Sequence, residues 1–161
     1  MDSVDIETSI VSHATARLSA DPIVRVLQQQ ARQWGNTERS KFMVVTSQLV
    51  LDEAALGDPL AAAERSKMLA DIDLIPADPG IEAVADQPIS RHLMPEKAPL
   101  DALHVATAAV GGVQYLLTQN CRHIANGHTL PRVYKTLAER GYPDLLIYTL
   151  SVFLGGHDDD K

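Results

Sequence analysis

Short apolar runs alternate along the chain with longer segments that begin in helix-capping residues, and few folds are compatible with this alternation. Apolar runs typical of buried strands occur at residues 4–7, 42–45, 73–76, 114–117 and 144–149. The helical segments between them open on pairs such as Asp21-Pro22 and Asp58-Pro59, an N-cap followed by proline at the first helical position. Strands that alternate with helices predict a mostly parallel sheet covered on both faces. We therefore expect residues 1–150 to form one three-layer α/β/α domain and residues 151–161 to be a disordered tail.

Some local features are predicted less directly. The residues before Gly57 are expected to form a helix capped by Thr46-Ser47, and Thr8-Ser9 are expected to cap the first helix. A loop is expected around Pro88 and Pro95. The helix expected from Pro22 to Trp34 carries an apolar series on one side, and its other face carries four polar residues, Arg25, Gln28, Gln29 and Arg32.

The helix expected from Pro99 to Val110 is almost wholly apolar, yet it contains Asp101 and His104. Such a helix is predicted to be buried. Burying a carboxylate and an imidazole is costly unless each has a partner, and positions i and i+3 put both on one face of the helix. His104 is therefore either a hydrogen-bonded core histidine or a ligand in a site.

Three carboxylates are predicted near strand ends, where open α/β sheets bind their ligands. Glu7 closes the first strand, Glu53 lies in the helix after the second, and Asp101 opens the helix before the fourth. Carboxylates that converge repel one another unless they share protons or bind a cation, and ligation by oxygen alone suits Mg²⁺ or Mn²⁺. Each acid also has an ordinary alternative. Glu7 can complement a helix dipole, Glu53 can be a solvated helix position, and Asp101 can be a first-turn acid.

The turn after the fourth strand is rich in polar side chains that can bind water, metal-bound water or phosphate, or simply cap the turn: Thr118, Gln119, Asn120, Arg122 and His123. Cys121 has no catalytic companion and is interpreted as a small buried residue. Gly111-Gly112 is interpreted as a helix stop, so the chain has no glycine-rich phosphate loop.

Composition limits the partners. The formal net charge is −7, which disfavours a nucleic-acid binder acting by charge alone and leaves open a local basic patch, a divalent metal or a basic protein partner. Aromatic residues make up 4%, too few for base stacking to dominate recognition. A single cysteine, no apolar run of membrane-spanning length and no signal-peptide pattern at the start predict a cytoplasmic protein without a membrane partner.

Four fragments occur in the order found in PIN domains: residues 6–9 (Ile-Glu-Thr-Ser), 47–53 (Ser-Gln-Leu-Val-Leu-Asp-Glu), 101–104 (Asp-Ala-Leu-His) and 117–120 (Leu-Thr-Gln-Asn). The chain resembles this family from Val4 to about Thr149, and the branch it resembles most is the VapC-type toxins of bacterial type II toxin–antitoxin systems. The resemblance implies a central parallel sheet in a three-layer α/β/α domain, and hydrolysis of RNA by acidic residues that hold Mg²⁺ or Mn²⁺.

By position, the resemblance implies that Glu7, Glu53 and Asp101 are the metal-binding and catalytic acids. Asn120 stands where many members carry a fourth acid. Glu7 replaces the usual Asp, which changes the reach of the first ligand, and Asn120 removes one negative charge, which weakens a second metal. The resemblance also implies a VapB-like antitoxin, whose typically basic arm would complement the negative charge of this chain.

Three functions remain open at this stage. In the first, the chain is a metal-dependent endoribonuclease and a homodimer, in which the catalytic Asn120 orients a water or metal-bound water and Arg25, Arg32 or Arg122 steers phosphate. The residues expected to support that site are Thr8, Thr118, His104 and His123. In the second, the same fold has lost efficient catalysis and binds nucleic acid or an antitoxin. In the third, the chain is a phosphatase-like enzyme, which the lack of an Asp-x-Asp nucleophile disfavours because Asp5-Ile6-Glu7 only imitates that motif.

Overall fold

The structure is a computed structural model that describes residues 1–90, 93–94 and 99–155. The strands are β1 (Ser3–Ile6), β2 (Met43–Thr46), β3 (Asp73–Leu74), β4 (Tyr115–Leu117) and β5 (Leu146–Tyr148). The α-helices are α1 (Thr8–Thr15), α2 (Pro22–Gln33), α3 (Gln48–Ala54), α4 (Pro59–Leu69), α5 (Gly80–Ser90), α6 (Pro99–Val110), α7 (Leu130–Glu139) and α8 (Leu150–Gly155). A π-helical turn (Trp34–Glu38) and a 3₁₀ turn (Arg39–Lys41) connect α2 to β2.

All five strands are parallel, and they lie in the order β3-β2-β1-β4-β5. The chain builds the sheet outward from β1 through β2 to β3, and then continues on the other side of β1 with β4 and β5. The strand order therefore reverses between β1 and β4. In open α/β sheets, ligands bind beyond the carboxyl ends of the strands at such a switch point. Glu7 follows β1 and Thr118 follows β4, so both stand at this position.

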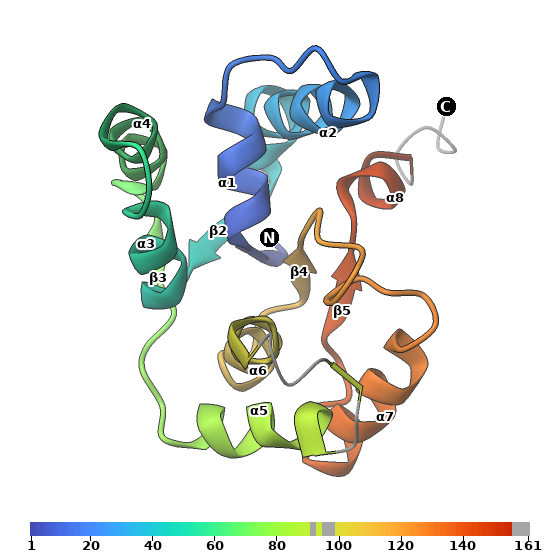
Figure 1. Cartoon of the computed structure of the whole chain (residues 1–161). Coiled ribbons are helices and arrows are strands. Elements are labelled where there is room, and N and C mark those ends of the chain that lie inside the picture. The colour runs from blue at the N-terminus through green and yellow to red at the C-terminus, as the bar shows by residue number, and fades with distance from the viewer. Residues whose placement is uncertain (91–92, 95–98, 156–161) are drawn as a thin grey trace.

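Helices cover both faces of the sheet. In Figure 1, α1 and α2 lie above the strands and α5 and α6 lie below them. One hydrophobic core joins residues of α1 to α4 and α8 with Val4, Ile6 and Leu117 of the sheet. The other joins residues of α5, α6 and α7 with Leu116 and Ile147. The predicted α/β fold with a central parallel sheet is confirmed.

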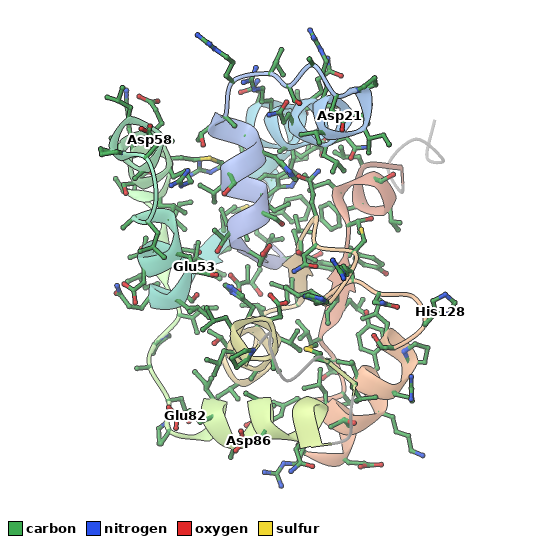
Figure 2. The ribbon with its side chains drawn as sticks, viewed as in Figure 1. Asp21, Glu53, Asp58, Glu82, Asp86 and His128 are labelled. Atoms are coloured by element: carbon green, nitrogen blue, oxygen red, sulfur yellow. The ribbon has the colours of Figure 1, made fainter. Side chains whose placement is uncertain are left out.

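Local capping sets the starts of several helices. Asp21 accepts a hydrogen bond from the backbone N–H of Ile23, and Asp58 accepts one from Ala61; in each case a proline begins the helix. Figure 2 marks these two aspartates on α2 and α4. The cap of α1 differs from the prediction, because Glu7, rather than Thr8 or Ser9, is its N-cap residue.

The apolar and polar residues of α2 do not divide simply into buried and exposed ones, although Ala31 of the apolar series is fully buried. Ile23 is 76% exposed and Val26 is 51% exposed, whereas Gln28 is only 3% exposed. Gln28 is buried because its amide spans the turn between α1 and α2: the oxygen accepts from the N–H of Ser19 and the nitrogen donates to the carbonyl of Arg17. These two hydrogen bonds satisfy the buried amide, so its burial costs little.

Two predicted irregular segments are helical. The loop expected around Pro88 is part of α5, which extends to Ser90 because Val84 and Ala85 pack into the core beside α6; Pro95 lies outside the described residues. The tail expected from residue 151 begins instead with α8, and residues 156–161 lie outside the described residues. Within the part of the chain that the structure describes, none of the helices is both long and apolar enough to span a membrane.

Candidate functional site

Glu7 is held by three hydrogen bonds at the end of β1. Its Oε2 accepts from the backbone N–H of Ser9 at 2.9 Å, from Ser9 Oγ at 2.5 Å and from Thr118 Oγ1 at 3.0 Å. The side chain is buried, with 5% of the residue exposed. Glu7 therefore caps α1, which places its carboxylate at the positive end of the helix dipole as the alternative from the sequence expected, and it also joins the end of β1 to the end of β4. Its Oε1 has no hydrogen bond within the described residues.

Glu53 and His104 form a close pair between α3 and α6. Glu53 Oε1 accepts from His104 Nε2 at 2.5 Å and from Thr8 Oγ1 at 2.8 Å. His104 is nearly fully buried, whereas the Glu53 side chain is 26% exposed. Glu53 is therefore not the freely solvated helix position that was the alternative, because Thr8 and His104 both contact its carboxylate.

The titration of this pair follows from the contact. Burial alone would raise the pKa of Glu53, but the hydrogen bond and the charge of His104 outweigh it and the pKa is lowered. Burial alone would lower the pKa of His104, but the hydrogen bond to Glu53 and the charges of Glu7, Glu53 and Asp5 outweigh it and the pKa is raised. Both shifts favour the charged forms. The buried histidine thus lies among three carboxyl groups.

Asp101, in the first turn of α6, is held by the turn after β4. His123 Nδ1 lies 2.8 Å from Asp101 Oδ2, and Asn120 Nδ2 donates to Asp101 Oδ1 at 3.4 Å. The side chains of Asp101 and His123 are 18% and 27% exposed. Asn120 in turn donates its backbone N–H to Thr118 Oγ1 at 2.9 Å.

These contacts join the predicted residues into one chain of hydrogen bonds. It runs from Glu7 through Thr118 and Asn120 to Asp101 and His123. Thr8, adjacent to Glu7 in sequence, connects to Glu53. The structure therefore connects Glu7 with Asp101 at the switch point of the sheet through Thr118 and Asn120.

Asp5 lies in the same region. From the sequence it was considered only as part of Asp5-Ile6-Glu7, an imitation of the Asp-x-Asp motif. It lies on β1 between Val45 of β2 and Leu116 of β4, is 3% exposed, and has no hydrogen-bond partner for Oδ1 among the described residues. Burial raises its pKa to about 8, with attraction to His104 opposing the rise and repulsion from Glu7 adding to it. Side chains two apart on a strand share a face, so the spacing of Asp5 and Glu7 is the signal that would have identified it.

A further contact was missed between α1 and the turn after β4. His13 Nδ1 lies 2.5 Å from Gln119 Oε1, and Gln119 Nε2 donates to the carbonyl of Leu27. The backbone N–H of Gln119 donates to Ser9 Oγ at 2.8 Å. Gln119 thus fixes the site turn against α1 and α2, which is a structural role.

The three arginines predicted to steer phosphate differ in their exposure and in whether they are already hydrogen-bonded. Arg32 donates to the carbonyls of Ala14 and Ala16, so its guanidinium caps the C-terminal end of α1. Arg25 and Arg122 are exposed, and Arg122 adjoins His123 in the site turn. Cys121, expected to be buried, is exposed instead, because the turn directs the apolar side chain of Ile124 into the core.

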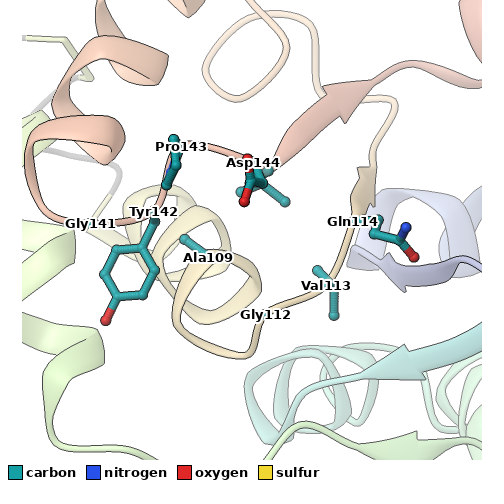
Figure 3. Close-up of a pocket in the computed structure, with 9 residues that line it drawn as sticks. Ala109, Gly112, Val113, Gln114, Gly141, Tyr142, Pro143 and Asp144 are labelled. Atoms are coloured by element: carbon teal, nitrogen blue, oxygen red, sulfur yellow. The ribbon is translucent and has the colours of Figure 1, made fainter.

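A separate pocket of about 410 Å³ lies at the opposite end of the sheet, near the amino ends of β4 and β5 (Figure 3). The residues that line it include Gln114, Tyr142 and Asp144. The amide of Gln114 is already engaged, since it accepts from the N–H of Ser3 and donates to Asp2. The predicted site and this pocket are therefore unrelated, and the polar network is the better candidate site.

The acids fit a hard divalent cation in their chemistry, because Glu7, Glu53 and Asp101 offer only oxygen donors. Glu53 Oε2, like Glu7 Oε1, has no hydrogen bond within the described residues. In the ranges 1–90, 93–94 and 99–155, however, no group of three His, Cys, Asp or Glu side chains is arranged to hold a metal ion.

Comparisons of the chain with protein-family models, curated proteins and solved structures found no match.

Proposed function

We propose that the chain is a divalent-metal-dependent endoribonuclease and the toxin component of a toxin–antitoxin pair. The observation that carries the proposal is the hydrogen-bonded chain that links Glu7, Asn120 and Asp101 at the switch point of a parallel sheet. Ligand sites of open α/β sheets occur at this position. The order of the fragments that resemble PIN domains supports the same assignment.

Glu7, Glu53 and Asp101 are the residues that would hold Mg²⁺ or Mn²⁺. The bound cation would supply Lewis acidity and a water of lowered pKa near a phosphodiester. The protein's own contribution is positional. Thr118 and Ser9 hold one oxygen of Glu7, and Thr8 and His104 hold one oxygen of Glu53. The other oxygen of each glutamate accepts no hydrogen bond from the residues that the structure describes, so it is the oxygen that would bind a cation.

The distribution of charge supports the proposed substrate and partner. Arg122 adjoins the site turn and Arg25 is exposed on α2, so both can attract RNA phosphates, whereas Arg32 is engaged by the end of α1. The net charge of −7 suits a VapB-like antitoxin with a basic arm. We also propose that the toxin acts in the cytoplasm as a homodimer.

A second candidate function is a binding module that shares the fold but cleaves RNA poorly. Two observations favour it. His104 is hydrogen-bonded to Glu53, so the cation must share that carboxylate with an imidazole. Asn120 is an amide at the position that contacts Asp101, which lowers the negative charge available to metals.

Cleavage of a panel of structured RNAs in the presence of Mn²⁺ separates the two candidates. The comparison includes Asp101→Ala and a matched acid-to-alanine control, Glu64→Ala, at an exposed position on α4. A nuclease requires cleavage by the wild type and Glu64→Ala and loss of cleavage in Asp101→Ala. Equal cleavage by all three would refute the nuclease, and RNA binding without cleavage would favour the binding module.

A further inference from the structure

His123 contacts Asp101 in a way that the proposed function does not yet use. Its Nδ1 lies 2.8 Å from Asp101 Oδ2, and Nε2 has no hydrogen-bond partner among the described residues. A carboxylate accepts hydrogen bonds and cannot donate them when ionised, so this contact requires the proton of the ring to be on Nδ1. The pair is partly buried, which strengthens the hydrogen bond relative to an exposed one.

Asn120 completes the arrangement from the other side. The backbone N–H of His123 donates to Asn120 Oδ1 at 3.0 Å, which fixes the amide so that Nδ2 is directed toward Asp101 Oδ1. His123 therefore acts on both oxygens of Asp101. Its ring contacts one oxygen, and its backbone orients the amide that contacts the other.

We propose that His123 is a positioning residue that fixes the plane of the Asp101 carboxylate through Nδ1–H and through the orientation of Asn120. The geometric part of this proposal stands alone, and its consequence for metal binding rests on the proposed function. Each oxygen of Asp101 keeps lone-pair capacity after accepting one hydrogen bond, so a fixed carboxylate remains a competent ligand. Histidines and amides that orient metal-binding carboxylates typically change metal affinity 10- to 100-fold when they are removed.

Three variants of His123 separate positioning from the other roles of an imidazole. His123→Asn keeps an N–H donor at the position of Nδ1, His123→Gln places its amide at the position of Nε2, and His123→Leu removes both. The control His128→Leu removes an exposed histidine outside the site. Titration calorimetry with Mn²⁺ is expected to give about 10- to 100-fold weaker binding for His123→Leu and His123→Gln. His123→Asn and His128→Leu are expected to bind Mn²⁺ as the wild type does.

Two outcomes of the calorimetry would contradict the proposal. If His123→Gln retains Mn²⁺ affinity and His123→Asn loses it, Nε2 is the operative atom and the proposal is wrong. If all three variants bind Mn²⁺ like the wild type, the ring of His123 does not position a ligand and the proposal is wrong. Thermal unfolding of each variant distinguishes a lost contact at the site from loss of the fold, which would lower affinity and melting temperature together.

A second measurement does not need a metal. Nitrogen-15 NMR of metal-free wild type is expected to show His123 with its proton on Nδ1, and Asp101→Ala is expected to shift the ring toward the Nε2-protonated tautomer. A wild-type ring protonated on Nε2 alone would overturn the proposal. If the wild type shows the expected tautomer but binds no Mn²⁺, the metal-dependent function fails while the positioning contact stands.

Discussion

The buried carboxyl of Asp5 predicts an unusual dependence of stability on pH. Its pKa is raised from 3.8 to about 8, chiefly by burial. Between these two pH values the folded chain keeps a proton that the unfolded chain has released. Stability therefore falls as pH rises through this window, opposite to the behaviour of a carboxylate that is paired in the folded state.

The magnitude follows from linkage. Where the folded chain holds one proton more than the unfolded chain, the free energy of unfolding falls by about 1.4 kcal/mol per pH unit. A window of about four units therefore corresponds to a loss of roughly 5 kcal/mol between pH 4 and pH 8. A loss of this size is comparable to the whole stability of many small domains, which is roughly 5–15 kcal/mol. Since Asp5 is buried in the central strand, with Oδ1 lacking a partner among the described residues, solvent screening does not reduce the effect.

The assay is urea unfolding of wild type and Asp5→Asn between pH 4 and pH 8.5 in the presence of a chelator. Asparagine has the size of aspartate but does not titrate, so contributions of the other acids and histidines largely cancel in the difference between the two proteins. We expect the wild type to lose stability relative to Asp5→Asn as pH rises, and the difference to begin levelling off only above about pH 8. A difference that stays constant across the range, or that changes in the opposite direction, would refute the assignment of Asp5 as a buried and unpaired carboxyl.

Two further substitutions test the hydrogen bonds that hold the edge of the sheet and the start of α3. Tyr134 donates to the carbonyl of Ile147 on the outer strand β5 and accepts from its N–H at 2.8 Å, so Tyr134→Phe is expected to lower the free energy of unfolding by about 1–2 kcal/mol. In urea unfolding, a loss no larger than that of Tyr142→Phe would show that water replaces these bonds. Ser47 Oγ accepts from the N–H of Val50 as the N-cap of α3, so Ser47→Ala is expected to cost about 1 kcal/mol. The contrary result is a melting temperature equal to that of Ser66→Ala, a serine-to-alanine control on the exposed face of α4.

Structural features that depend only on residues nearby in the sequence were predictable from the sequence. Asp21-Pro22 and Asp58-Pro59 start helices because the cap bonds the helix's own backbone, and no distant partner is needed. The burial of α6 followed from its composition, and that of His104 from its place within the helix. The parallel sheet followed from the alternation of strands and helices.

The errors occurred where a distant contact reverses a local tendency. Gln28 is buried although glutamine is usually exposed, because Arg17 and Ser19 satisfy its amide. Cys121 is exposed because the turn that carries it is anchored by Ile124. Neither of these outcomes is encoded in the periodicity of the segment itself.

In the candidate site, too, some features were predictable from the sequence and others depended on the folded chain. Glu7, Glu53 and Asp101 were identifiable in the sequence, because an acid beside an apolar run is conspicuous and strand ends are where such folds bind ligands. Their partners depended on the folded chain. Thr118 meets Glu7 across 111 positions of sequence, and His104 meets Glu53 across 51. Local sequence sets backbone geometry through short-range capping and periodicity, whereas the side chain that satisfies a buried charge is chosen by the packing of the sheet and its helices.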